Sequence, residues 1–374
     1  MQVKIPSYYK KFKCIAGKCS DTCCDGWRII IDDKSVKKYR EHSGVLKERF
    51  QERLVSYNGE SIFVPDGSRC PFLNSKNTCD IYICMGEDAL SSTCSAYPRK
   101  ISVKGNVMEA FLNLSCPEAA RLMLNEKDGI KFEKYDDGVQ PETVVSDRDI
   151  FMDMLEEVFI NIVNEKRISW KKRLVMILFA ADNICSSTDK DFDVCMEFVM
   201  SLKNQNGIME LSELIPDSVL IENTEIKKQI LSALLNVYGA ICIGRNHDSM
   251  SVDLMREYLE NENTGFTDNE DILEGYNYQY ENYVTYFIFR HLKECVTGRD
   301  IFEMAVMMCA SYSIIKAMDV MCIRRYGELS LENQVEIMHY YSKIVEHSDK
   351  DYNRIMDIIR DCGFDTMAYM VQLT

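Results

Sequence analysis

The sequence lacks the short motifs that assign a function at once. It contains no GxGxxG and no GxxxxGKS/T pattern, which excludes a recognisable dinucleotide or P-loop site. Only five histidines occur, and none forms a pair at the i, i+4 spacing of a helical metal site. No combination of Ser, His and Asp supports nucleophilic catalysis. Standard motifs therefore identify no catalytic residue.

The chain also has little that would place it across a membrane. The first residues, MQVKIPSYYKKFKC, contain no apolar stretch of the kind found in secretory signal peptides. No run approaches the roughly 20 apolar residues that a membrane-spanning helix needs. We therefore expect a cytoplasmic protein without a transmembrane segment, in which thiols stay reduced.

Positive charge is in deficit, since the formal net charge is −15. This balance argues against general nucleic-acid binding. Residues 1–116 nevertheless carry 18 Lys and Arg against 13 Asp and Glu, whereas residues 117–374 carry 26 against 46. The first part could face an acidic partner or associate peripherally with an anionic membrane, although a solvated surface is the commoner role of such charges.

Cysteine, in contrast, is abundant. Nine of the sixteen cysteines lie between Cys14 and Cys116, and four of these fall within the 11 residues from Cys14 to Cys24. Thiolates packed this densely repel one another unless a metal, a cluster or disulfide pairing removes their charge. In a reducing compartment metal ligation is favoured, so the pattern predicts a metal or iron–sulfur site. The other seven cysteines show no ligand spacing and are expected to be buried thiols.

Two kinds of metal centre compete for this cysteine pattern. Structural zinc sites usually use paired CxxC knuckles, and the chain has no CxxC. A 4Fe–4S cluster also takes four thiolates and tolerates irregular spacing. Iron–sulfur is therefore favoured, with zinc, or purely structural or redox thiols, as alternatives. The adjacent Cys23 and Cys24 cannot easily close a disulfide with each other, so one of them could ligate while the other lies behind it.

Hydrophobic patterns divide the chain into two unlike parts. Residues 1–125 are rich in turn signals and contain a short strand at Arg28–Asp32, a helix over 32–54 and a hairpin over 101–114. Residues 126–147 are polar and are predicted to form a linker or covering loop. From residue 148 apolar side chains recur at i, i+3 and i+4, which predicts about seven to nine helices.

We therefore expect a mainly α fold. A small, loop-rich cysteine cluster-binding domain with a short hairpin, residues 1–125, would pack on an α-helical bundle, residues 148–374. Within the second part, the acidic and Tyr-rich stretch Asn261–Glu281 is predicted to be a loop. The methionine-rich helices are expected to fill the core, because Met adapts to irregular packing.

Four segments of the first part resemble a known family. In chain order they read CIAGKCSDTCCDGWRIIID, RCPFLNSKNTCDIY, GEDALSSTCSAYPR and LNLSCPEAARL. In this order they resemble the flagellin lysine-N-methylase family. Parts of them also resemble short zinc- or iron-chelating proteins of the CxxCC type. Together they extend from about Tyr8 to Leu124, a third of the chain.

The resemblance implies methyl transfer from S-adenosylmethionine to the ε-amine of lysines on flagellin, with dependence on a cysteine-bound iron–sulfur centre. By motif match the candidate metal ligands are Cys14, Cys19, Cys23, Cys24, Cys70, Cys79, Cys94 and Cys116. Cys84 lies outside the pattern. Four further residues fall on motif positions and are expected to have structural roles: Trp27, Tyr97, Arg99 and Glu118. Arg99 could pair with a carboxylate, and Glu118 could lie in the first turn of a helix.

The chemistry of this reaction leaves several alternatives open. Lysine must be methylated as the neutral amine, so a base or a desolvating pocket is needed. An open iron that chelated the cofactor would leave three cysteine ligands on the cluster, and Cys19-x3-Cys23 supplies only the first half of a radical CxxxCxxC motif. Polar or radical transfer, one or two clusters, and oligomerisation all stay open.

The sequence also allows two other functions and a pocket formed by tyrosines. The chain could be an iron–sulfur or zinc sensing, storage or electron-transfer module whose helices dock a partner, or a zinc-stabilised scaffold. Tyrosines in the stretch Tyr276–Tyr286 could line a cation–π pocket for lysine or the sulfonium, although a partly solvated loop is favoured.

Overall fold

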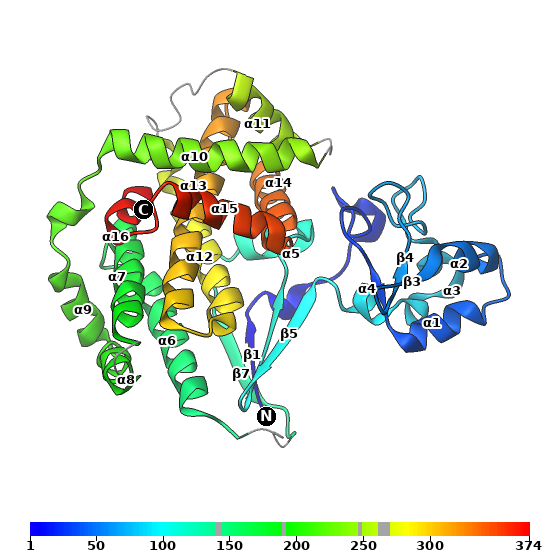
Figure 1. Ribbon diagram of the computed structural model, residues 1–374, viewed down its shortest axis with the longest axis horizontal. Helices are drawn as coiled ribbons and strands as arrows, with labels where there is room; N and C mark the ends of the chain where they lie inside the picture. Colours follow the sequence, from blue (N-terminus) through cyan, green and yellow to red (C-terminus); the bar gives the residue numbers. More distant parts are fainter. Residues whose placement is uncertain (140–143, 189–191, 246–248, 261–269) are drawn as a thin grey trace.

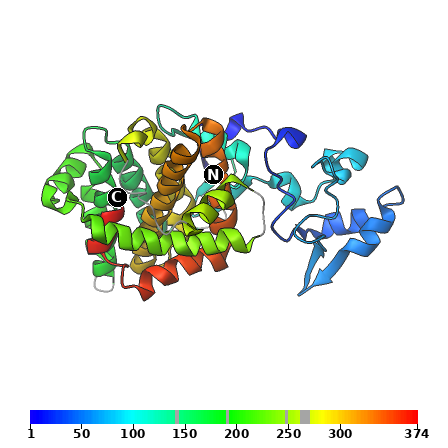
Figure 2. The same cartoon turned by 90° about the horizontal axis from the view of Figure 1, so that it is seen from above.

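A computed structural model describes residues 1–139, 144–188, 192–245, 249–260 and 270–374. The chain forms a large body of helices and a smaller, loop-rich part that projects from one side of it (Figures 1 and 2). We call residues 13–98 the cysteine lobe and residues 144–374 the helical body. The prediction of a mainly α fold with a small cysteine-rich N-terminal part is confirmed.

The cysteine lobe has short elements around its own small core. In chain order they are η2 Ala16–Lys18, β2 Ile30–Ile31, α1 Asp33–Arg40, α2 Lys47–Arg53, β3 Leu54–Tyr57, β4 Glu60–Phe63, α3 Asp80–Met85, η3 Glu87–Ala89 and α4 Ser92–Ala96. The three strands form an antiparallel sheet in the order β2-β4-β3. Stacked rings fill the core, with centroids 4.5 Å apart for Tyr39 and Phe50 and 4.7 Å apart for Phe50 and Phe72.

One helix predicted in the lobe is divided. The expected helix over 32–54 consists of α1 and α2, and the residues between them include Gly44. Asp32 is the N-cap of α1, because its carboxylate accepts a hydrogen bond from the Ser35 backbone N–H at 3.0 Å. The predicted short strand is present as β2.

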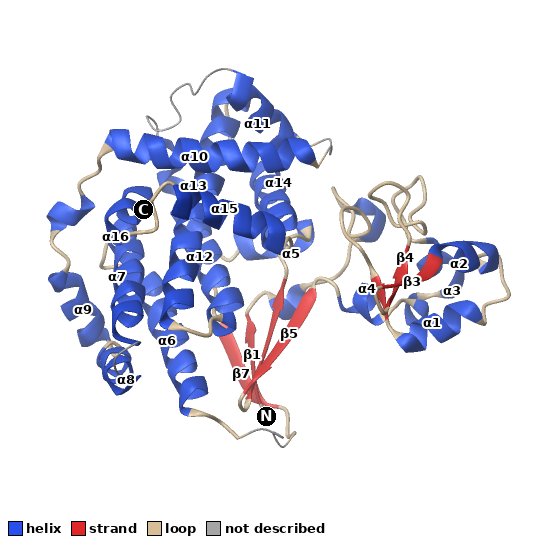
Figure 3. Cartoon of the chain, viewed as in Figure 1, coloured by secondary structure: helices blue, strands red, loops and turns tan. Residues whose placement is uncertain are grey.

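A second sheet lies between the lobe and the helical body (Figure 3). Its strands are β1 Gln2–Pro6, β5 Arg99–Lys104, β6 Val107–Leu112 and β7 Phe132–Asp136, and the short helix η1 Tyr9–Lys11 follows β1. The order is β5-β6-β1-β7, with β1 parallel to β6 and antiparallel to β7. The predicted hairpin is β5–β6. Because β7 belongs to residues 126–147, this sheet joins two of the predicted segments, and the domain limits at 125 and 148 stay a prediction.

Most of the helical body consists of α-helices. Its elements, with α5 leading from the second sheet, are α5 Pro117–Leu124, α6 Asp147–Asn164, α7 Trp170–Thr188, α8 Phe192–Ser201, α9 Gln205–Leu214, η4 Asp217–Leu220, α10 Thr224–Gly244, α11 Met250–Glu260, η5 Glu270–Tyr276, α12 Asn277–His291, η6 Leu292–Glu294, α13 Gly298–Tyr326, α14 Leu331–Tyr341, the π-helix η7 Ser342–Glu346, α15 Asp349–Asp361, α16 Met367–Met370 and η8 Val371–Leu373. From residue 148 on, the described ranges thus hold more helices than the seven to nine expected, because short ones such as α9 and α16 carry little periodic signal.

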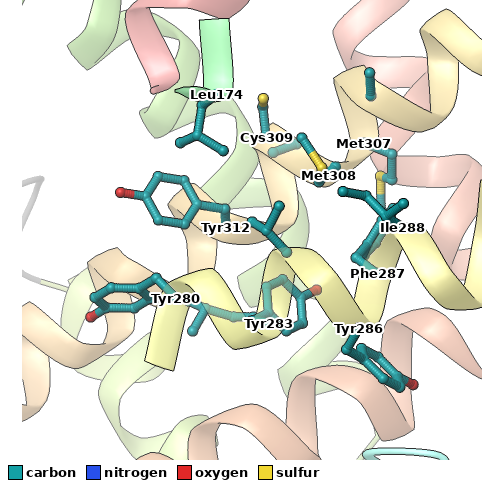
Figure 4. Packing of buried hydrophobic residues seen from close by; sticks show 14 of the residues in the cluster. Leu174, Tyr280, Tyr283, Tyr286, Phe287, Ile288, Met307, Met308, Cys309 and Tyr312 are labelled. Atoms are coloured by element: carbon teal, nitrogen blue, oxygen red, sulfur yellow. The ribbon is translucent and has the colours of Figure 1, made fainter. Parts of the chain in front are cut away.

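Helix α13 runs through the centre of the body. A capping box of Thr297 and Asp300 begins it, and Gly327, with φ +80°, ends it in the left-handed conformation. Met307, Met308 and Cys309 are fully buried along it. Met307 lies near Phe287 and Ile288 of α12, whereas Cys309 lies on the side of Leu174 (Figure 4). The methionines therefore pack in the core, as expected.

The loop predicted over Asn261–Glu281 is wrong where it can be compared with the structure. Residues 261–269 lie outside the described ranges, but the following residues form η5 and the buried helix α12. Tyr280, Tyr283 and Tyr286 are each at most 2% exposed, so they are neither a solvated loop nor the lining of an open pocket. The polar residues that suggested a loop find partners inside the body: Glu281 accepts from Arg173 at 2.7 Å, for example.

Two helices, α10 and α13, are long and apolar enough to cross a membrane by length and composition alone. Of the apolar window in α13, 83% is buried inside the protein, and of that in α10, 50%. The core helices of soluble proteins pass the same test, so this finding is weak support for a membrane span.

A buried cluster of charges fastens the second sheet to the body. Lys4 on β1 and Lys293 on η6 both contact Glu156 of α6, whose side chain is 0% exposed. Lys293 also lies 2.6 Å from Glu109 of β6. Burial lowers the pKa of Lys4 to about 8. Each buried charge is thus compensated by charges on another element.

We expect Glu156→Ala to destabilise the protein by about 3 kcal/mol, because it removes the close carboxylate partner of the buried Lys4 ammonium and leaves only Glu109, at 4.0 Å. Urea unfolding followed by circular dichroism measures this loss. Glu133→Ala is the matched control, because it removes the exposed pair of Glu133 with Lys10 and should leave the unfolding free energy nearly unchanged. Equal effects of the two substitutions would contradict the assigned role of Glu156.

Candidate metal centre

Backbone hydrogen bonds bring the first two cysteine segments together. The N–H of Cys70 donates to the carbonyl of Cys24 at 2.7 Å, which fixes residues 70–79 beside the end of the first segment. An antiparallel bridge between Leu73 and Cys79 then closes the second segment on itself. The Sγ atoms of Cys23 and Cys24 lie 3.9 Å apart. The chain segments that were predicted to share a site are therefore neighbours.

Three candidate ligands stand at the N-termini of helices. Cys79 is the N-cap of α3 and Cys116 is the N-cap of α5. Cys94 lies in the first turn of α4, where its backbone N–H donates to Oγ of the N-cap Ser91 at 3.2 Å. Free N–H groups and the positive end of a helix favour a thiolate. These positions suit cysteines that ligate a metal as thiolates.

Burial and the closeness of other thiols raise the pKa values of several of these cysteines. Burial raises the pKa of Cys94 to about 11, and the nearby Cys79 and Cys23 thiols add to this shift. Burial raises the pKa of Cys116 to about 12, with further contributions from Cys19 and Cys23. Because each thiol opposes the ionisation of the next, a bound cation would relieve a repulsion that the bare site carries.

The same interactions connect all eight candidate ligands. The Cys14 and Cys23 thiols contribute to the raised pKa of Cys19, and the Cys70 and Cys79 thiols contribute to the raised pKa of Cys24. With the two couplings above, every member of the set has another member as a neighbour. Cys84, which the sequence pattern left out, is exposed on α3.

The thiols come from both parts of the molecule. Cys70, Cys79 and Cys94 pack against the core of the lobe, whereas Cys116 belongs to the core of the helical body. Cys14 and Cys23 are exposed. In the described ranges no three His, Cys, Asp or Glu side chains are close enough to hold a metal ion as they stand. The donor set, thiolates alone, nevertheless suits zinc and iron–sulfur clusters.

The remaining motif residues connect the lobe to its surroundings. The ring of Trp27 lies 5.2 Å from that of Tyr97 and 5.5 Å from that of His347. Arg99, expected to pair with a carboxylate, lies instead over the ring of Phe12 at 4.9 Å. Glu118 is in the first turn of α5, as expected, and pairs with Arg121.

The first cysteine segment docks on the π-helix η7. Lys343 donates to the carboxylate of Asp21 at 2.6 Å. Burial alone would raise the pKa of Asp21, but the charges of Lys343 and His339 outweigh burial and lower it. Gly26 adopts φ +98°, and a Cβ there would lie 3.3 Å from the Lys343 side chain. The residues between the cysteines thus make the contact with the body.

Sequence reasoning missed these partners on η7. Lys343 and His347 lie in a helical region far from the cysteines along the chain, and no local motif marks them. Ile344 and Val345 of η7 continue the apolar spacing of Tyr340 and Tyr341, so the sequence does not distinguish this π-helix from an α-helix. π-Helical turns occur frequently at functional sites.

Comparison with known proteins decides the relationship. Residues 156–373 match the family described as FliB lysine N-methylase C-terminal domain. The chain belongs to this family. Residues 13–117 also match the CxxCxxCC family of zinc- or iron-chelating domains. The FliB-type helical body and the metal-chelating segment thus correspond to the two parts of the structure, and the resemblance read from the sequence is confirmed.

Two named relatives cover different shares of the chain. It is 20% identical to "Lysine-N-methylase" of Salmonella typhimurium over 387 aligned positions, which cover 95% of each protein. It is 32% identical to "Flagellar biosynthetic protein FliU" of Salmonella muenchen over 132 positions, or 33% of this chain and 78% of that protein. No solved structure matches the chain.

We expect the metal-free protein to show slow alkylation of Cys94 and Cys116. With pKa values raised to about 11 and 12, both groups are protonated at pH 8, and only the thiolate reacts. Mass spectrometry after iodoacetamide treatment should show rates at least about tenfold below that of the exposed Cys84. The rates should rise as the pH approaches 11. Equal rates for all three at pH 8 would contradict the crowding.

Proposed function

We propose that the protein is a cytoplasmic S-adenosylmethionine-dependent lysine N-methyltransferase that acts on flagellin and depends on an iron–sulfur centre held by its cysteines. The observation that carries the proposal is that one chain combines a FliB-type helical body with a cysteine-rich segment that matches zinc- or iron-chelating domains. A relative is named as a lysine-N-methylase and another as a flagellar biosynthetic protein, which supports lysine as the modified residue and flagellin as its carrier.

Eight thiols are enough for two sets of four ligands. One possible division is Cys14, Cys19, Cys23 and Cys116 in one set and Cys24, Cys70, Cys79 and Cys94 in the other, with Cys23 between them, because its thiol also raises the pKa of Cys79 and Cys94. The adjacent pair Cys23–Cys24 would place one thiol in each set. Two tetrathiolate sets match two clusters, or one cluster with reserve thiols. Zinc in one or both sets is the alternative that the same donors allow.

An iron–sulfur centre, when bound, supplies electron transfer or an open iron for ligand binding. The chain itself would exclude water from the centre and hold the cysteine lobe against the helical body, where the reaction would occur. Trp27 closes one side of the cysteine segment by packing between Tyr97 and His347. The docking of Asp21 on Lys343 keeps this segment on the body.

The transfer itself breaks the sulfonium S–CH3 bond and forms an N–CH3 bond to lysine. An ammonium has no lone pair, so one proton must leave the lysine before the bond forms. The products are S-adenosylhomocysteine, methyl-lysine and that proton. Peripheral membrane contact and oligomerisation stay predictions of the sequence.

We expect Cys19→Ser to lose bound iron and sulfide together with methylation of flagellin. Iron and acid-labile sulfide are measured on protein purified without oxygen, and methyl-lysine is measured by mass spectrometry. Cys84→Ser, which removes the neighbouring exposed thiol outside the set, is the matched control and should keep both properties. An active Cys19→Ser protein that contains no iron would refute the dependence on the centre.

The identity of the metal is expected to show in the visible spectrum. A protein purified without oxygen should be brown, with a broad band near about 400 nm from iron–sulfur charge transfer. Metal analysis of the same sample quantifies iron and zinc. A colourless protein with stoichiometric zinc and no methylation activity would favour a zinc-stabilised scaffold over the enzyme.

A further inference from the structure

A cleft of about 540 Å³ opens on the body beside the docked cysteine segment. Its walls come from the end of α12, the start of α13, the segment after η7, α15 and β5. Helix α15 and strand β5 lie on the side of the body from which the lobe projects (Figure 1). His347 belongs to the wall and also packs on Trp27, three residues after Cys24. The cleft therefore borders the candidate metal centre.

The charges of the cleft favour a cation. Five carboxylates line it against three Lys or Arg side chains: Glu294, Asp300, Glu303, Glu346 and Asp349 against Lys100, Arg290 and Arg360. Burial lowers the pKa of His291, so this ring adds no positive charge near neutral pH. Because Arg299 also pairs with Glu303 from outside the wall, the excess that remains is one negative charge. A concave surface with a negative excess concentrates cationic ligands.

The cleft also offers groups for the other parts of a mixed ligand. Met304, Tyr352 and Met356 supply an apolar wall of the kind on which a nucleobase packs. Lys100, half-exposed at the rim, pairs with Glu294 at 3.3 Å, and a ligand carboxylate could approach the same ammonium from the solvent side. The buried Nε2 atom of His291 has no hydrogen-bond partner within the described ranges. An unsatisfied buried nitrogen in a cleft wall is a group that a ligand or water must satisfy.

We propose that this cleft binds S-adenosylmethionine, with the carboxylates facing its sulfonium and ammonium and the apolar wall facing its adenine. The proposal rests on the function proposed above and places the donor in the helical body, not on an open iron. The volume lies in the range typical of sites for ligands of this size. The open side leaves the methyl group accessible to a lysine carried by another protein.

The charge of the ligand gives the cleft a specific signature. S-adenosylmethionine carries a net charge of +1, whereas the product S-adenosylhomocysteine, which lacks the methyl group, carries none. An acidic cleft therefore binds S-adenosylmethionine more tightly than S-adenosylhomocysteine. Replacing cleft carboxylates by neutral amides reduces this difference in affinity. A substitution that merely loosened the fold would weaken both ligands alike.

The test measures the dissociation constants of both ligands for the intact, metal-loaded protein by isothermal titration calorimetry. For the double variant Glu303→Gln/Asp349→Asn we expect the affinity for S-adenosylmethionine to fall about tenfold and that for S-adenosylhomocysteine to fall by less than about threefold. Asn353→Trp, at an exposed position of the wall, should abolish binding of both by filling the cleft. Asp217→Asn, on η4 outside the cleft, is the control and should bind as the parent does. Circular dichroism confirms that each variant is folded.

The outcomes separate this proposal from the proposed function. If the parent binds S-adenosylmethionine, the cleft variants bind it unchanged and Cys19→Ser loses it, the donor sits on the metal centre and the cleft proposal is overturned while the methyltransferase stands. If the parent protein binds no S-adenosylmethionine and methylates no lysine, both proposals fail. Selective loss in the double variant supports the cleft.

Discussion

Repulsion between crowded thiols is the constraint on which the N-terminal third of the molecule depends. Eight sulfur atoms are confined among short loops, and the core behind them is little more than a few stacked rings around Phe50 and Phe72. Backbone hydrogen bonds such as that from Cys70 to Cys24 hold the loops together at the cost of holding the thiols close. As long as the thiols stay protonated the repulsion is latent, and a bound metal converts it into attraction. The lobe is in this sense a scaffold shaped for a cation.

The helical body has the opposite character, because its buried charges are paired with charges inside the protein. Charges buried between the sheet and the body, around Glu156 and Lys293, are matched within the protein. The same holds for the polar residues of α12, which face partners on other helices. The two parts meet over a limited set of contacts, chiefly Asp21 with Lys343 and Trp27 with His347. The cleft and the first cysteine segment both border this junction between the lobe and the body, so a reaction that uses both would occur there.

Local patterns in the sequence predicted what local forces determine. The long amphipathic helices and the hairpin were predicted from the sequence, because each depends on spacing along the chain. The set of eight cysteine ligands was taken from the family resemblance and stays a prediction. The division of the first helix near Gly44 was not predicted. Helix α12 was not predicted either, because burial among distant partners overrides the polar character of Gln279, Glu281 and Asn282. Lys343 and His347 were beyond reach for the same reason: a contact across most of the chain leaves no periodic trace. The metal and its geometry depend on an ion that the sequence does not contain.

The contact of Asp21 with Lys343 spans 322 positions of the chain. During synthesis from the N-terminus, the first four cysteines emerge early, but the surface on which their segment docks is made almost last. The thiol set itself is incomplete until Cys116 has emerged and α5 has found its place in the body. A truncated chain would therefore carry these cysteines without the surface of η7 on which their segment docks.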